Sequence, residues 1–136
     1  MKHSIDRITI IGILERNGQP ERRRLRSGLV LLLDVPGSGE PVRRRHNYTV
    51  RLRMWLHRGD PIRWEDDEAV TEIRTSRGSM MSGLFYGIEG MRVGGTRRLE
   101  IAPHLAYGKE GVPGKIPENA LITAEITVLA AVEAPC

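Results

Sequence analysis

The sequence predicts an α+β domain in which a curved antiparallel sheet of five or six strands wraps around one short helix. Period-two alternation of apolar and polar residues recurs along the chain, which is typical of half-buried strands. Helical spacing occurs in one short segment alone. The 136 residues, 40% apolar and 28% charged, are enough for one core and too few for two domains of ordinary size.

Five segments are predicted strands. The clearest is 47–57, and segments 96–102 and 121–129 show the same alternation. Segment 28–35 is more apolar than alternation requires, so we expect it to be covered on both faces, and 69–75 is a weaker candidate. The side chains predicted to face the core are Tyr48, Val50, Leu52, Met54, Leu56, Leu99, Ile101, Ile122, Ala124, Ile126 and Val128.

The N-terminal region has strand signals of its own. A β-branched run covers residues 5–15, and Asn17-Gly18 is a strong hairpin signal. Pro20 limits the returning strand to an edge, because proline cannot donate a backbone hydrogen bond. We therefore expect an extra strand or hairpin before the main sheet.

The single predicted helix covers residues 82–91. Ser82 is a candidate N-cap, and Leu84 and Ile88 lie four residues apart on one face. Three glycines in the segment each cost about 1 kcal/mol relative to alanine. The helix must therefore be held by packing against the sheet, and Tyr86 is expected on its solvent side.

Composition excludes several functional classes. No apolar run approaches the ~20 residues of a membrane span and no secretory leader pattern is present, so no membrane contact and a cytoplasmic location are expected. The lone Cys136 and four scattered histidines lack the spacing of a metal or redox site. The net charge of +4 is modest, and the arginine clusters at 22–26 and 43–45 are interpreted as solvated turns, so nucleic-acid binding is not expected.

A long glycine- and proline-rich loop, HLAYGKEGVPGKIPENA, covers residues 104–120 and contains one aromatic residue, Tyr107. Its GVPGKI stretch is not a phosphate-binding loop, because Ile116 stands where serine or threonine would bind magnesium. No Gly-x-Ser-x-Gly nucleophile motif is present either. The function of this stiff loop is therefore not explained by either of these catalytic motifs.

The order of these pieces resembles the FKBP family of peptidyl-prolyl isomerases. The resemblance covers residues 27–130, leaves 1–26 as an N-terminal extension, and makes 27–136 the FKBP-like domain. The matching positions are Gly83, Gly87, Met91, Val93, Gly94, Leu99, Ile101, Pro103, Ala106, Tyr107, Gly108, Gly111, Pro113, Gly114, Ile116, Pro117 and Ala120.

The resemblance implies a shallow apolar cleft between helix and sheet that accepts a proline side chain, with the long loop arching over it. Tyr107 would donate a hydrogen bond to a substrate carbonyl, and Ile116 would supply a backbone amide and an apolar wall. No cofactor is implied. The other implied substrate-binding residues are Leu52, Ile62, Trp64, Met80, Met81, Leu84 and Ala124.

The chain departs from the family where aromatic side chains are usual. Leu84, Leu52, Ala124 and Thr71 occupy such positions, which predicts a larger, flatter pocket and low activity. The family's aromatic-acid pair is either Ile62-Arg63 or Trp64-Glu65, depending on the alignment. Met80 and Met81 either fill lost aromatic volume or are simply core.

Two functions follow from the resemblance. The first is a peptidyl-prolyl cis-trans isomerase that rotates Xaa-Pro bonds and assists protein folding, with proline-containing polypeptides as partners. The alternative is a non-catalytic FKBP-fold binding module that has lost efficient isomerase activity. Macrolide ligands of the family are expected to bind weakly, because the ring platforms are missing.

Overall fold

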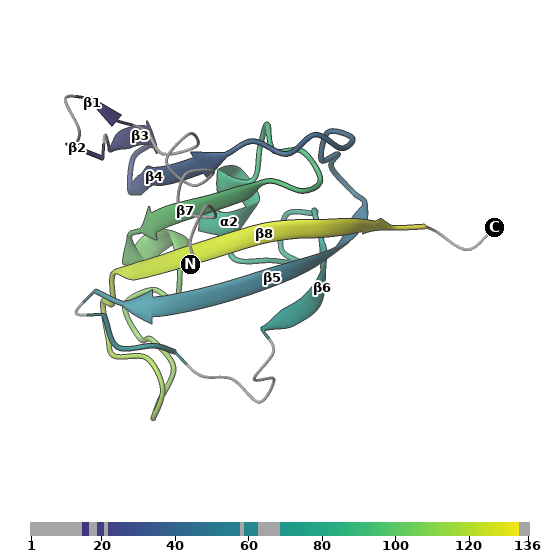
Figure 1. The fold of residues 1–136 in the computed structure, drawn as a ribbon. Helices are drawn as coiled ribbons and strands as arrows, with labels where there is room; N and C mark the ends of the chain where they lie inside the picture. Colours follow the sequence, from purple (N-terminus) through teal and green to yellow (C-terminus); the bar gives the residue numbers. More distant parts are fainter. Residues whose placement is uncertain (1–14, 17–18, 21, 58, 63–68, 134–136) are drawn as a thin grey trace.

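The computed structural model of the protein describes residues 15–16, 19–20, 22–57, 59–62 and 69–133. Six strands form one antiparallel sheet in the order β3-β4-β7-β8-β5-β6, which curves around a short helix, α2 (Figure 1). The fold class predicted from the sequence is confirmed. The strands are β3 (Arg23–Arg26), β4 (Leu29–Val35), β5 (Asn47–Leu56), β6 (Val70–Arg74), β7 (Thr96–Ile101) and β8 (Ile122–Val132).

A second, two-stranded sheet precedes the main one. It pairs β1 (Glu15–Arg16) with β2 (Gln19–Pro20), and Arg16 lies opposite Gln19, as a hairpin centred on residues 17–18 requires. The turn residues themselves, and residues 5–14 of the predicted run, lie outside the described residues. The extension predicted for residues 1–26 contains β3, which pairs with β4 at the edge of the main sheet.

The two arginine clusters have different structures. Arg44 and Arg45 lie in a turn, as predicted. The interpretation of the 22–26 cluster as a solvated turn is wrong for the backbone, because Arg23–Arg26 is strand β3; every position of that strand is exposed. A row of arginines suits an edge strand, since charge there opposes pairing with other chains.

Alternation predicted the core correctly. The inward side chains of β5, β7 and β8 pack in two contiguous clusters, one under the loop end of the sheet and one under its other end. On β4, Leu29, Leu31 and Leu33 are buried, and the outward Val30 and Leu32 are half-buried, so this strand is partly covered on its second face.

Helix α2 is shorter than predicted and begins differently. It covers Ser82–Gly87, and residues 88–90 form a turn. Ser82 is not the N-cap: that position is Met81, whose carbonyl oxygen accepts hydrogen bonds from the amides of Leu84 and Phe85. Gly90 then takes a positive φ of 87°, which ends the helical path.

The glycines of α2 allow it to lie directly on β7. A Cβ at Gly83 would come within 2.4 Å of Ile101 Cγ2, and a Cβ at Gly87 within 2.4 Å of Leu99 Cδ1. Both distances are below van der Waals contact. The intrinsic cost of glycine in a helix is therefore offset by close packing on the sheet, as the sequence predicted.

The outer aromatic residues of α2 are covered by arginines. Tyr86 was expected on the solvent side, but it is half-buried, and the guanidinium carbon of Arg26 lies 3.6 Å from its ring centroid. Phe85 is 8% exposed, with Arg44 at 5.2 Å from its ring. Strand β3 and the 44–45 turn thus cover a helix face that the sequence left open.

Candidate active site

The loop after β7 is held by its own hydrogen bonds. A single 3₁₀ turn, η1 (Pro103–Leu105), leads into it, and the Gly108 amide donates to the Pro103 carbonyl at 2.7 Å. Further along, Val112 and Ile116 exchange backbone hydrogen bonds at 2.9 and 2.8 Å. The loop is therefore a small ordered structure, as its glycine and proline content predicted.

Tyr107 lies at the base of this loop with its hydroxyl turned towards the sheet. The phenol oxygen is 3.9 Å from Met54 Sδ of β5, a distance suited to a weak hydrogen bond to sulfur. Burial raises the pKa of the Tyr107 hydroxyl above its usual range. The group is therefore protonated at neutral pH and able to donate.

The structure brings together eight of the nine residues predicted for the site. They come from β5, the bridge after it, the start of α2, the loop and β8, and all belong to one apolar cluster. Trp64, the ninth, lies outside the described residues, as do Arg63 and Glu65, so the choice between Ile62-Arg63 and Trp64-Glu65 stays open. The eight are Leu52, Ile62, Met80, Met81, Leu84, Tyr107, Ile116 and Ala124.

Within this cluster the residues lie at two depths. Leu84, Ile116 and Ala124 are 4%, 3% and 0% exposed, so they form the floor. Leu52, Ile62, Met80, Met81 and Tyr107 are partly buried and present accessible surface above it. Ala124 therefore supports the site from beneath, and direct contact with a ligand falls to the upper set.

Met54 is a site residue that sequence reasoning missed. It faces Ala124 across the β5–β8 pair and contacts the Tyr107 hydroxyl through its sulfur. Its long side chain belongs to the same buried cluster as the small Ala124, and it is 7% exposed. Its place on the inner face next to Leu52 was the signal that could have identified it.

The backbone amide of Ile116 does not play the predicted role. It donates to the Val112 carbonyl at 2.8 Å inside the loop, so it is already used. The turn dipeptide Pro113-Gly114 between these residues was the sequence signal for that pairing. The amides of Met81, Ser82 and Gly83 precede the Leu84 amide, the first that donates within α2, and they lie beside the apolar cluster.

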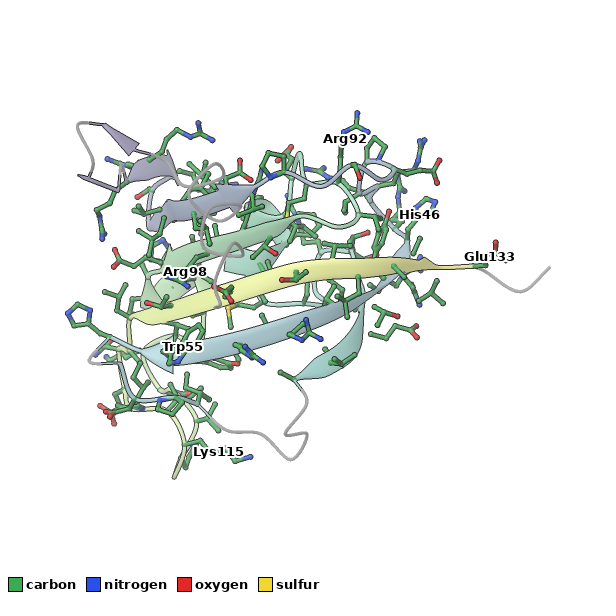
Figure 2. The ribbon with its side chains drawn as sticks, in the orientation of Figure 1. His46, Trp55, Arg92, Arg98, Lys115 and Glu133 are labelled. Carbon is green, nitrogen blue, oxygen red and sulfur yellow. The ribbon has the colours of Figure 1, made fainter. Side chains whose placement is uncertain are left out.

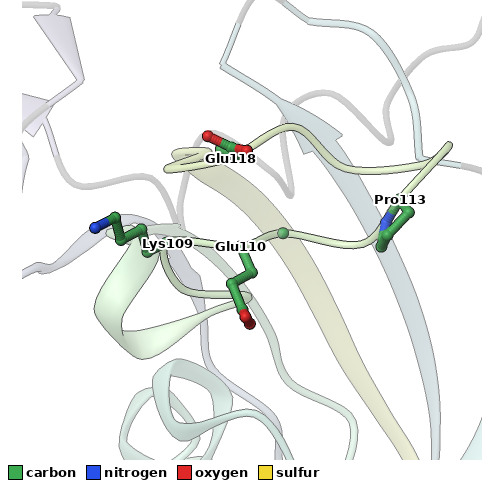
Figure 3. A pocket seen from close by; sticks show the side chains of 5 residues that line it. Lys109, Glu110, Pro113 and Glu118 are labelled. Carbon is green, nitrogen blue, oxygen red and sulfur yellow. The ribbon is translucent and has the colours of Figure 1, made fainter.

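A cavity of about 530 Å³ opens within the loop itself. It is lined by Lys109, Glu110, Gly111, Pro113 and Glu118, and Figure 3 shows Glu118 on the returning arm across from Glu110. None of the predicted site residues lines it. Its mixed charges make it a polar neighbour of the apolar cluster.

Three further findings concern the described part of the chain. Its histidine and acidic side chains form no group arranged to hold a metal ion. None of its helices is both long and apolar enough to cross a bilayer. Thr71, predicted to replace an aromatic residue, is exposed on β6.

Comparison with known proteins identifies the family. Residues 39–129 match the FKBP-type peptidyl-prolyl cis-trans isomerase family over more than half of the chain. The chain belongs to this family. FKBP16-4, a chloroplastic peptidyl-prolyl cis-trans isomerase of Arabidopsis thaliana, is 47% identical over 62 residues, covering 46% of this chain and 26% of that protein. FK506-binding protein 4 of Chaetomium thermophilum is 36% identical over 93 residues, covering 68% of this chain and 19% of that protein.

Solved FKBP structures have the same fold. AtFKBP13 superposes with a TM-score of 0.74 at 25% identity, covering 82% of this chain and 99% of that one. FkpA from Escherichia coli gives a TM-score of 0.72 at 25% identity, covering 96% of this chain and 58% of that one. The chain spans less than a third of the length of the two curated FKBP relatives named above.

Proposed function

We propose that this FKBP-type chain catalyses cis-trans isomerisation of Xaa-Pro bonds in flexible polypeptides and so assists protein folding. The observation that carries the proposal is the Tyr107 hydroxyl, protonated and directed at the apolar cluster that gathers the predicted site residues. A cytoplasmic location stays a prediction.

The reaction suits a site without a nucleophile or metal. Amide resonance gives the Xaa-Pro bond a rotation barrier of ~18–20 kcal/mol, and the uncatalysed exchange takes tens to hundreds of seconds. A site lowers this barrier if it binds the twisted amide more tightly than the planar one. A millionfold acceleration corresponds to about 8 kcal/mol of such preference.

Under this proposal, three features of the chain would favour binding of the twisted amide over the planar one. The upper apolar residues, among them Leu52, Ile62 and Met80, would grip the prolyl ring. Their low polarity disfavours the charge-separated planar amide relative to the twisted one. Tyr107 would replace its contact with Met54 by a hydrogen bond to the substrate carbonyl, fixing the acyl group while the prolyl side rotates.

A protease-coupled assay on an Xaa-Pro tetrapeptide tests the proposal. The Tyr107→Phe variant should lose about fivefold in kcat/KM, because one neutral hydrogen bond contributes roughly 1 kcal/mol. Tyr86→Phe is the matched control, since it removes the hydroxyl of a half-buried tyrosine that is not one of the predicted site residues, and it should leave the rate unchanged. A wild-type rate equal to that of buffer alone would reject catalysis.

An amide-shift titration with the same peptide separates this proposal from the binding-module alternative. Binding that shifts Tyr107 and Met81, without faster cis-trans exchange in the peptide, would favour the non-catalytic function. Weak macrolide binding remains part of the proposal, because Leu84 and Ala124 offer no ring faces and almost no accessible surface.

A further inference from the structure

A second cavity lies away from the predicted groove. Its volume is about 330 Å³, and it opens between β3, the end of α2 and β7. Tyr86 lines it, and Tyr86 is two residues from Leu84, so the two side chains leave the helix in nearly opposite directions. The residues that matter for its chemistry are Arg23, Leu25, Arg26, Tyr86, Glu89 and Arg97.

The charges of this cavity are unbalanced. Arg97 is neutralised, because it donates to Asp34 and to the carbonyls of Gly87 and Glu89. Glu89 is itself paired, with Arg44 at 3.6 Å. Among the described residues, Arg23 and Arg26 have no acidic partner. The cavity therefore has two cations available to an external anion.

Arg26 is held in a pose suited to binding a carboxylate. Its guanidinium lies 3.6 Å from the Tyr86 ring centroid, and a guanidinium on a ring face keeps its edge N–H groups free for a bidentate contact. The Tyr86 ring thereby limits the rotamers of Arg26. Less side-chain entropy is lost when an acid binds to a pre-positioned arginine.

The cavity also offers an apolar contact. Leu25 lies between the two arginines on β3 and is 37% exposed, one of two large apolar side chains so exposed in the described residues. A polypeptide with acidic and apolar side chains would use both features. We propose that this cavity binds an acidic segment of a partner polypeptide, with carboxylates on Arg23 and Arg26 and an apolar side chain against Leu25.

The surroundings favour a peptide over a nucleic acid. On the sheet face turned away from α2, Arg98 projects as Figure 2 shows, and it is paired with Glu125 at 2.7 Å. Arg22 is likewise paired with Glu100. These two neighbouring cations are thus neutralised by carboxylates, which interrupts the run of free positive charge that a phosphate backbone would follow beside the cavity.

Calorimetry and amide-shift mapping on the full chain test the proposal. The probe is a blocked, proline-free octapeptide with four acidic residues around one leucine, so it offers no prolyl ring to the site proposed at Tyr107. Shifts are expected at Leu25, Arg26 and Tyr86, with Tyr107 unchanged. Affinity should fall as NaCl rises from about 50 mM to about 300 mM, because the contacts are ionic.

Matched variants locate the site. Arg23→Gln combined with Arg26→Gln should weaken binding about tenfold or more, roughly 1.4 kcal/mol, with isomerase rate unchanged. Arg51→Gln combined with Arg53→Gln removes the same charge from exposed positions on β5 and should have no effect. Four outcomes would each overturn the proposal. Two concern the variants and the probe: both double variants bind the acidic peptide equally well, or an Asn/Gln version of the peptide binds as tightly as the acidic one. The other two are tighter binding of single-stranded DNA of matched charge, and no binding at millimolar peptide.

Discussion

The guanidinium of Arg97 in β7 donates a hydrogen bond to the carbonyl of Gly87, the last residue of α2, at 2.8 Å. The same side chain reaches the carbonyl of Glu89 at 2.7 Å and Asp34 at 3.2 Å, and it is 11% exposed. One buried cation therefore satisfies the end of the helix that carries Leu84, and fixes the distance between helix and sheet.

Replacing Arg97 should loosen α2. Arg97→Met is expected to lower the free energy of unfolding by about 2–3 kcal/mol, because Asp34 and two carbonyls lose a charged donor while they stay partly buried. Chemical denaturation measures the loss. The neighbouring Arg98→Met, which removes an exposed cation paired with Glu125, is the control and should cost under about 1 kcal/mol. Similar losses for the two variants would contradict this role of Arg97.

Tyr107 should make stability depend on alkaline pH. Its pKa in the folded chain is raised by burial, above the value of 10.0 for an unperturbed tyrosine. The stability that the neutral phenol contributes is therefore complete below about pH 10 and is lost as pH rises through the folded pKa. Urea denaturation should show the wild type losing more stability than Tyr107→Phe above about pH 10. If the free energy of unfolding fell equally with pH in both proteins, the raised pKa of Tyr107 would be refuted.

Met54 and Ala124 should compensate for each other in volume. They are cross-strand partners in one buried cluster, so Ala124→Phe is expected to cost about 1–3 kcal/mol through overpacking. The double variant Ala124→Phe plus Met54→Ala should lose at least about 1 kcal/mol less free energy of unfolding than the sum of the losses of the two single variants. A double-mutant cycle in urea measures this coupling, and strictly additive costs would show that the side chains do not share space.

Gly87 should not tolerate a methyl group. Alanine there gains about 1 kcal/mol of helix propensity, but its Cβ would lie 2.4 Å from Leu99 Cδ1. We expect Gly87→Ala to destabilise the fold by about 1–3 kcal/mol net. Thermal or urea unfolding measures this loss. The double variant Gly87→Ala plus Leu99→Val should lose less free energy of unfolding than the sum of the losses of the two single variants. A stabilised single variant would mean that α2 can move away from β7.

Strands and loop were predictable because their signals are local. Alternation from Tyr48 to Leu56 reflects one buried face, and the sequence shows that pattern directly. The loop after Tyr107 is defined by its glycines and prolines, whose backbone preferences do not depend on distant residues. The grouping of eight site residues in one cluster came from the family resemblance, which places positions that periodicity alone leaves apart.

The remaining features depend on tertiary contacts. The end of α2 is set by Arg97, ten residues from Gly87. Tyr86 is covered by Arg26, far away in the sequence, and no periodicity reports such a contact. The Ile116 amide is a different case: the family resemblance assigns it to the substrate, whereas the structure gives it a local acceptor, the Val112 carbonyl four residues earlier.

Under the proposed function, the internal hydrogen bonds of the loop would also set how quickly the chain exchanges polypeptide substrates. Because the hydrogen bonds between Val112 and Ile116 already order the loop, a bound peptide would not have to order it, and binding would cost little conformational entropy. Encounter and release should then be fast on the timescale of the bond rotation itself. A site of this kind would bind many unfolded chains briefly and retain none of them.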